Sequence, residues 1–153
     1  MFEIDKQTGK LSLLQKFVAD FTEENPSLNN VVLSFDNSLL ATGGDDTVVR
    51  IYAMSKDFKN HEKKLEIKVA EGAIQSIDIS RDNRLLVAGS KDGTAYVTDL
   101  TKKGAIVQKL NFKPAPNQKN MNMRSMIFAR DNSLYTLTTM AQMPTYLIRW
   151  QCT

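Results

Sequence analysis

Three segments of the chain repeat one another, and this internal repetition limits the fold more than any other feature. Each repeat has an apolar run, an Asp-Asn dipeptide and then further apolar runs. The second dipeptide, Asp82-Asn83, follows Asp36-Asn37 by 46 residues, and Asp131-Asn132 follows after another 49. The repeats cover residues 31–54, 74–100 and 123–153. Chance is a poor explanation for such regular spacing.

Polar and apolar residues alternate within the repeats. In the second repeat, Ser76, Asp78 and Ser80 alternate with Ile77 and Ile79, which is the period of a strand with one buried face. Asp, Asn and Gly separate these short runs, and such residues favour tight turns because their backbone or side chains suit turn geometry. The pattern predicts antiparallel strands and leaves little room for helices.

A turn motif recurs before the last strand of the repeat. It has the sequence Gly89-Ser90-Lys91-Asp92-Gly93-Thr94 in the second repeat and Gly43-Gly44-Asp45-Asp46-Thr47 in the first. The motif resembles the Gly-Ser-x-Asp-Gly-Thr turn of WD repeats, which build β-propellers from four-stranded blades. The resemblance implies that Asp46, Asp92 and Gly93 are structural turn residues and that the aspartates hold strands together by hydrogen bonding.

The chain also departs from the WD pattern. The Trp-Asp dipeptide that names the repeat is replaced by Tyr52-Ala53 and Thr98-Asp99, and only Trp150-Gln151 keeps its tryptophan. The Gly-His dipeptide is missing, and Glu71-Gly72 lies near its position.

On this resemblance we expect an all-β fold, a partial WD-type β-propeller with about three four-stranded antiparallel blades. One domain would cover residues 1–153, with the last strand of an earlier blade at 2–5. Blades would follow at about 10–54, 64–100 and 105–153, and we expect their first strands at Lys10–Ala19, Lys64–Ala70 and Ala105–Phe112. Lys113–Asn122 is expected to be a surface loop, because its two prolines remove backbone donors.

Several residue patterns argue against an enzyme. The chain has one cysteine and one histidine, which supply no ligand set for zinc and no disulfide. His61 lies in a lysine-rich stretch, away from any expected apolar strand. Gly44-Asp45-Asp46 resembles the metal-binding hairpin of RNA-dependent polymerases, but the matching turn at Asp92-Gly93 explains it better. Gly89-Ser90-Lys91 lacks the spacing of a phosphate-binding loop. We expect no catalytic residue, cofactor or metal.

The net charge is +3, and lysines are concentrated in Lys56–Lys68 and Lys102–Lys119. These runs favour solvated loops over a nucleic-acid surface, because they contain few arginines and aromatic residues. The longest uncharged run, Asn132–Ile148, is too polar for a membrane helix, and no signal peptide opens the chain. A late group of methionines favours core packing over an adaptable binding surface: Met121, Met123, Met126, Met140 and Met143.

A narrower resemblance covers about two thirds of the chain. It is carried by Glu71–Ile79, Asp82–Val87, the loop Pro114–Asn117, the strand Met123–Ala129 and the ending Pro144–Trp150. In order and loop character these segments are similar to the family of prolactin regulatory element-binding proteins, which are endoplasmic-reticulum exchange factors for the COPII coat GTPase.

This resemblance implies a guanine-nucleotide exchange factor at the cytosolic face of the endoplasmic reticulum, with the small COPII GTPase as its partner in transport to the Golgi. The family's potassium-binding loop would precede Met1 and a membrane helix would follow Thr153, so we expect an interior piece of a longer protein. Alone, the piece should lack exchange activity, and its open blades should self-associate. The alternative is a WD-repeat interaction scaffold without exchange activity.

Overall fold

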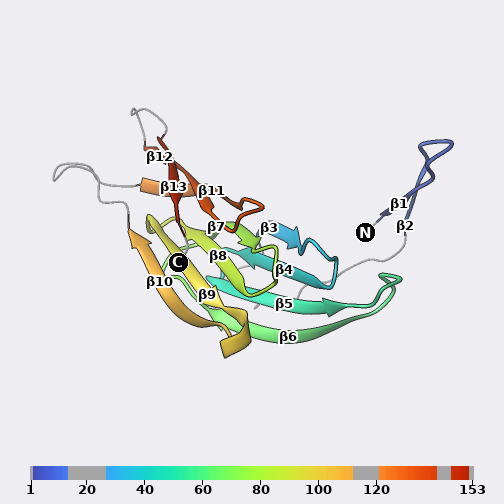
Figure 1. Ribbon diagram of the computed structural model, residues 1–153, viewed down its shortest axis with the longest axis horizontal. Coiled ribbons are helices and arrows are strands. Elements are labelled where there is room, and N and C mark those ends of the chain that lie inside the picture. Colours follow the sequence, from blue (N-terminus) through green and yellow to red (C-terminus); the bar gives the residue numbers. More distant parts are fainter. Residues whose placement is uncertain (1, 14–26, 112–120, 141–145, 152–153) are drawn as a thin grey trace.

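The computed structural model describes residues 2–13, 27–111, 121–140 and 146–151, which form antiparallel sheets (Figure 1). The first four-stranded sheet consists, in spatial order, of β3 (Leu28–Leu33), β4 (Leu39–Gly44), β5 (Val48–Met54) and β6 (His61–Lys68). The second consists of β7 (Ile74–Ile79), β8 (Leu85–Ser90), β9 (Thr94–Asp99) and β10 (Ala105–Asn111). The third consists of β11 (Met121–Phe128), β12 (Leu134–Met140) and β13 (Tyr146–Trp150).

A separate two-stranded sheet pairs β1 (Phe2–Ile4) with β2 (Leu11–Leu13). Apart from one turn of 3₁₀ helix at Leu100–Lys102, the described residues are strands and turns. No helix among these residues is long and apolar enough to span a bilayer. The prediction of an all-β fold built from antiparallel sheets is confirmed, although the third sheet has three strands among the described residues where four were expected.

The assignment of the first strands to the blades was wrong. The strand within Lys64–Ala70 is β6, which pairs with β5 and therefore closes the first sheet. The strand within Ala105–Phe112 is β10, which pairs with β9 and closes the second. Short turns precede both strands, and a short turn between antiparallel strands brings them together as a hairpin. Each sheet therefore begins with the strand just before its Asp-Asn dipeptide.

Within Lys10–Ala19, only 10–13 is described, and there β2 pairs with β1 instead of opening the first sheet. In the expected loop Lys113–Asn122, residues 113–120 lie outside the described part, while Met121 and Asn122 already belong to β11. The extent of the domain and the self-association of the chain stay predictions.

The second sheet is buried on both faces. Alternate residues of β8 and β9 point in opposite directions: Leu86, Ala88 and Tyr96 pack against the first sheet, whereas Val87 and Val97 pack against the third. This is the two-sided burial expected of a blade between two neighbours. Met123 and Met126 are buried in the second of these cores, which confirms the packing role predicted for them.

Two equivalent glycines allow the sheets to approach closely. A β-carbon on Gly43 would lie 2.8 Å from the Ile74 side chain, and one on Gly89 would overlap the Met126 side chain. Gly43 lies in β4 and Gly89 at the matching position of β8, so each faces the first strand of the next sheet. The repeat therefore keeps a residue without a side chain where the next sheet packs closely against it.

Candidate functional site

Asp92 joins three parts of the second repeat by hydrogen bonds. Its carboxylate accepts bonds from the Tyr96 hydroxyl at 2.9 Å, the Glu71 amide at 3.2 Å and the Thr94 amide at 2.8 Å. Burial raises the pKa of Asp92, but the bonds from Tyr96 and Thr94 outweigh burial, so its pKa lies below the usual value. Asp92 thus connects the turn to the segment before β7; its contribution to stability stays a prediction.

Asp46 has the same position in the first repeat but a different partner. Its carboxylate forms an ion pair with the Arg50 guanidinium at 2.5 Å, and both side chains are at most 4% exposed. It also accepts a bond from the Val48 amide at 3.2 Å. Arg50, four residues on, stands where the second repeat has Tyr96. Sequence reasoning identified both aspartates but neither partner, although the shared spacing of four residues was readable.

The residue after each of these aspartates has a left-handed backbone. Gly93 has a φ of 84° and Thr47 a φ of 65°. Glycine adopts this region at no steric cost, whereas a β-branched residue is strained there. The turn geometry is therefore the same in both repeats, but only one repeat has the residue that suits it.

The Asp-Asn dipeptides form a second set of equivalent turns. Asn37, Asn83 and Asn132 all have φ values between 59° and 63°. The Asp36 carboxylate accepts bonds from the Ser34 hydroxyl and the Ser38 amide. The turns of Asp82 and Asp131 repeat most of this pattern. These turns connect the first and second strands of each sheet.

Hydrogen bonds between these turns connect neighbouring sheets. The Asn83 amide group donates to the Asp36 carboxylate at 2.8 Å, and that of Asn132 donates to Asp82 at 3.3 Å. The bond from Asn83 is the main cause that holds the pKa of Asp36 far below its usual value. The Ser80 hydroxyl is the main cause of the lowered pKa of Asp82. Sequence reasoning treated these dipeptides only as turns.

The lysine-rich segment Lys56–Lys68 is not a loop throughout, because β6 begins at His61. Exposed ion pairs join its lysines to glutamates of the same strand, Lys64 to Glu62 and Lys63 to Glu66. Charged side chains on an outer strand oppose pairing with other strands.

His61 lies beside an apolar strand, contrary to expectation, because β6 pairs with β5. Its ring and the Tyr52 ring form a T-shaped contact, with the ring centres 5.8 Å apart. Among the described residues, no group of three or more His, Cys, Asp or Glu side chains is arranged to hold a metal ion.

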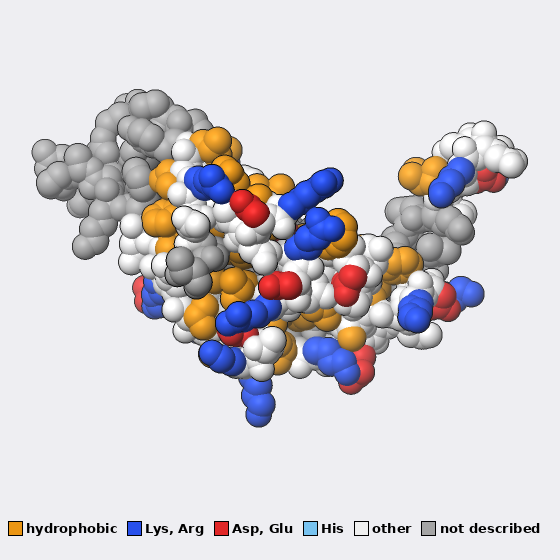
Figure 2. All heavy atoms as spheres, viewed as in Figure 1, with side chains coloured by type: hydrophobic (Ala, Val, Ile, Leu, Met, Phe, Trp, Pro, Cys, Tyr) orange, Lys and Arg blue, Asp and Glu red, His pale blue; other side chains and the backbone are white. Residues whose placement is uncertain are grey.

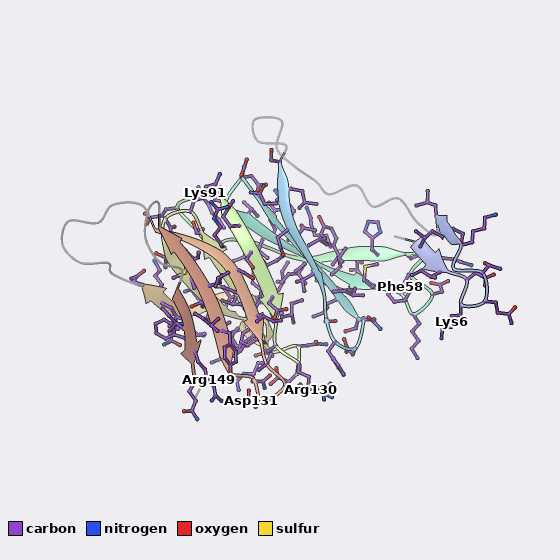
Figure 3. The ribbon with its side chains drawn as sticks, turned by 90° about the horizontal axis from the view of Figure 1, so that it is seen from above. Lys6, Phe58, Lys91, Arg130, Asp131 and Arg149 are labelled. Atoms are coloured by element: carbon purple, nitrogen blue, oxygen red, sulfur yellow. The ribbon has the colours of Figure 1, made fainter. Side chains whose placement is uncertain are left out.

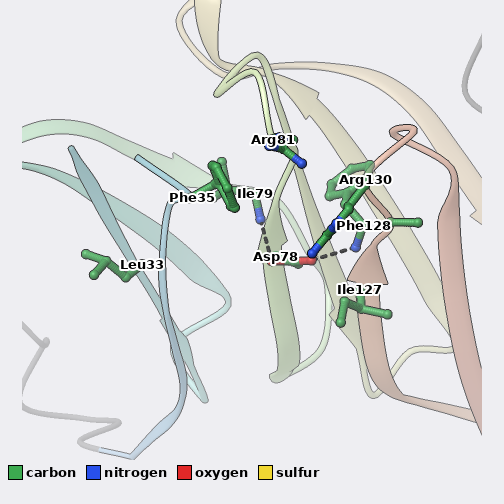
Figure 4. A pocket seen from close by; sticks show the side chains of 9 residues that line it. Leu33, Phe35, Asp78, Ile79, Arg81, Ile127, Phe128 and Arg130 are labelled. Carbon is green, nitrogen blue, oxygen red and sulfur yellow. Dashed lines mark hydrogen bonds between the residues drawn. The ribbon is translucent and has the colours of Figure 1, made fainter. Parts of the chain in front are cut away.

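A shallow hollow lies where the first strands of the three sheets end. β7 contacts β3 on one side and β11 on the other, so the ends of these strands converge (Figure 4). The hollow has a volume of about 230 Å³ and is lined by Leu33, Phe35, Asp78, Ile79, Arg81, Ile127, Phe128, Ala129 and Arg130. Figure 3 shows Arg130 at the same end of the sheets as Arg149, while Lys91 lies at the opposite end.

Equivalent residues of the repeats form the rim of this hollow. Phe35, Arg81 and Arg130 each directly precede the aspartate of an Asp-Asn dipeptide. The Arg81 guanidinium lies 4.1 Å from the centre of the Phe35 ring. Sequence reasoning missed this site, yet the alignment of the repeats contained the signal, since it places the three residues in one column.

Asp78 forms part of the floor of the hollow. Its carboxylate accepts bonds from the Phe128 amide at 2.6 Å and the Ile79 amide at 2.9 Å. Burial is the main cause that raises the pKa of Asp78, against the effect of these two bonds. The Phe128 bond joins β7 to β11, so Asp78 connects two sheets at the site.

The comparisons with known proteins agree with this fold. The family model of the WD domain, G-beta repeat, matches residues 15–53 and 60–99. The chain is also similar to the guanine nucleotide-exchange factor SEC12 of Mus musculus and that of Rattus norvegicus, with 36% identity over 80 residues in both cases. The match covers 52% of this chain and 18% of each relative.

The matched WD models cover just over half of the chain, and the sheets repeat the same turns, glycines and inter-sheet bonds. The first two repeats keep this architecture without the Trp-Asp dipeptide, and in them Arg50 and Tyr96 donate to the turn aspartates. The chain belongs to the WD-repeat family, as a WD domain of the G-beta repeat type.

Proposed function

We propose that this chain is part of the propeller of a guanine-nucleotide exchange factor for the small GTPase of the COPII coat, at the cytosolic face of the endoplasmic reticulum. The observation that carries the proposal is the 36% identity to SEC12 over 80 residues. Because the match covers only 18% of those relatives, exchange activity itself, the GTPase partner and the location all belong to the proposal.

Exchange of this kind breaks no covalent bond. A factor that binds the nucleotide-free GTPase more tightly than the GDP-bound form must, by thermodynamic linkage, lower the affinity of the GTPase for GDP. The factor needs a rigid surface that fits one state of the partner. Sheets joined by the bonds from Asn83 to Asp36 and from Phe128 to Asp78 supply such rigidity.

A chimera tests the proposal directly. The 80 matching residues of mouse SEC12 would be replaced by those of this chain, and release of a fluorescent GDP analogue from the COPII GTPase would be measured. We expect the chimera to accelerate release. A control chimera would carry WD repeats of equal length from an unrelated propeller and should not do so.

A folded chimera that is no more active than this control would contradict the proposal. It would favour the second candidate, a WD-repeat interaction scaffold without exchange activity, for which the family membership is the supporting observation. Circular dichroism and thermal unfolding would establish that both chimeras fold.

A further inference from the structure

Large apolar side chains are exposed to solvent at the hollow formed by the ends of β3, β7 and β11. Phe35 is 66% exposed and Ile127 is 60% exposed. Both border the same hollow, with Leu33 beside them. Such apolar surface, enclosed by polar turns, is typical of a place where another chain binds. Figure 2 shows apolar and charged side chains interspersed across one face of the molecule.

The cations at the hollow are available to an acidic ligand. Within the part of the chain that the structure describes, no ion pair engages Arg81 or Arg130. Arg81 is held over the Phe35 ring, which fixes its position but leaves its edge able to donate to a carboxylate. The two arginines come from neighbouring repeats, so they flank the hollow (Figure 4).

Asp78 does not neutralise this surface fully. Both of its carboxylate oxygens already accept backbone bonds, from Ile79 and from Phe128. Burial also raises its pKa, which lessens its negative charge near the acidic end of the pH range. Among the residues that line the hollow, two arginines, Arg81 and Arg130, accompany one carboxylate, Asp78.

We propose that this hollow binds a short segment of another protein in which a carboxylate is flanked by apolar side chains. The apolar residues would pack on Phe35 and Ile127, and the carboxylate would bind Arg81 and Arg130. The charges around the site favour this occupant over a nucleic acid. Asp36 and Asp82 directly follow two rim residues, and their lowered pKa values keep them negative, so they repel a polyanionic strand.

Fluorescence anisotropy with the 153-residue chain tests this proposal. The probe is a fluorescein-labelled peptide, Gly-Ser-Leu-Asp-Phe-Gly-Ser, and the matched probe has Asn in place of Asp. We expect saturable binding of the first peptide and roughly five-fold weaker binding of the second, as for the loss of one charge-assisted contact. A fluorescein-labelled oligothymidine should bind more weakly than either peptide.

Two variants locate the site. Arg130→Gln should weaken binding of the Asp peptide roughly five-fold and leave the Asn peptide unchanged. Phe35→Ser should weaken both peptides. The control is Arg84→Gln, which also removes one positive charge but lies outside the hollow. There the Arg84 Nε atom is 3.6 Å from the Asp99 Oδ2 atom. Arg84→Gln should change neither affinity.

Equal binding of the two peptides, equal effects of Arg84→Gln and Arg130→Gln, no binding of the Asp peptide, or preferred binding of oligothymidine would each overturn the proposal. Unfolding curves of all variants would show whether a lost affinity reflects a lost fold. Because Phe35 and Arg130 lie in the turns of different repeats, after β3 and β11, each variant tests the site from a different side. The proposal does not depend on exchange activity.

Discussion

The turn at Asp46-Thr47 and the turn at Asp92-Gly93 have the same backbone but different chemistry. Asp46 forms a buried ion pair with Arg50, whereas Asp92 accepts a hydrogen bond from a neutral tyrosine. Thr47 is strained at a positive φ that suits Gly93. The WD architecture thus fixes the position of the carboxylate and the shape of the turn. The partner of the carboxylate, four residues later, is free to differ.

The largest expected effect is that of Asp46→Ala. The change leaves the Arg50 guanidinium buried without its main partner, and breaking one side of a buried ion pair costs about 3 kcal/mol or more of the free energy of unfolding. Urea denaturation followed by circular dichroism would measure this. The double variant Asp46→Ala, Arg50→Met should recover part of the loss, because it removes the stranded charge. A smaller loss for Asp46→Ala than for Asp92→Ala would contradict the comparison.

Asp92→Ala should cost roughly 1–3 kcal/mol, since it removes a hydrogen-bond acceptor from three donors but strands no charge. Tyr96→Phe should cost less, because it removes one of those donors only. The matched control is Asp45→Ala, at a half-buried residue whose carboxylate accepts a bond from the Asn29 side-chain amide at 2.7 Å, and it should cost least. An unchanged thermal midpoint for Asp92→Ala would mean that Asp92 is merely a solvated turn residue.

Exchanging the residue types at the two left-handed positions, Thr47 and Gly93, tests how much the backbone strain at Thr47 costs. Thr47→Gly should raise the free energy of unfolding by up to about 1 kcal/mol, because relief of backbone strain exceeds the extra entropy of glycine in the unfolded chain. The reverse change, Gly93→Thr, should lower it by roughly 1–2 kcal/mol. Thermal unfolding of both variants would measure the shifts. Destabilisation by Thr47→Gly would show that the Thr47 side chain has a role beyond the turn.

The smallest expected effect is a change in how the free energy of unfolding depends on pH, and it concerns the Asp-Asn turns. The pKa of Asp36 is lowered in the folded chain, so its contribution to stability is present above the unfolded value of about 4 and is lost as the pH falls below it. Asp36→Asn should therefore weaken the loss of stability in acid, measured as urea midpoints between pH 7 and pH 2.5.

Asp57→Asn is the control for that experiment. Asp57 lies in a similar turn, and a bond from Ser55 is the main cause of its lowered pKa, but no neighbouring sheet donates to it among the described residues. Its variant should change the acid dependence less than Asp36→Asn does. If the two variants behave alike, the bond from Asn83 adds nothing to the stability of the folded chain.

Much of the fold was predictable because it depends on local patterns that recur. The alternation around Ile77 and the turns at Asp36, Asp82 and Asp131 indicated antiparallel strands, and the repeated Asp-Gly turn indicated WD repeats. The membership of β6 and β10 was not predicted correctly, because repetition gives the order of strands and not which sheet a strand joins. The hairpin turn at 55–60 was the available signal, since its Ser55 and Asp57 repeat the bonding of the Asp-Asn turns.

The candidate site was harder to predict, because it is built from residues that meet only when three repeats are packed side by side. Phe35, Arg81 and Arg130 are 46 and 49 residues apart in sequence and border one hollow in space. The burial of Arg50 was also not readable, because an arginine in a strand is exposed in most proteins. Its buried partner Asp46 explains the exception.

The bonds from Asn83 to Asp36 and from Asn132 to Asp82 both run from a later repeat to the one before it. The second repeat thus carries both a donor to the repeat before it, Asn83, and an acceptor for the repeat after it, Asp82. A gene duplication that copies such a repeat copies both the asparagine donor and the aspartate acceptor. The new repeat can then bond to the repeats on either side without a compensating mutation. The Asp-Asn dipeptide is therefore complementary to its own copies. Because the asparagine always belongs to the later repeat, the two ends of a row of repeats are not equivalent.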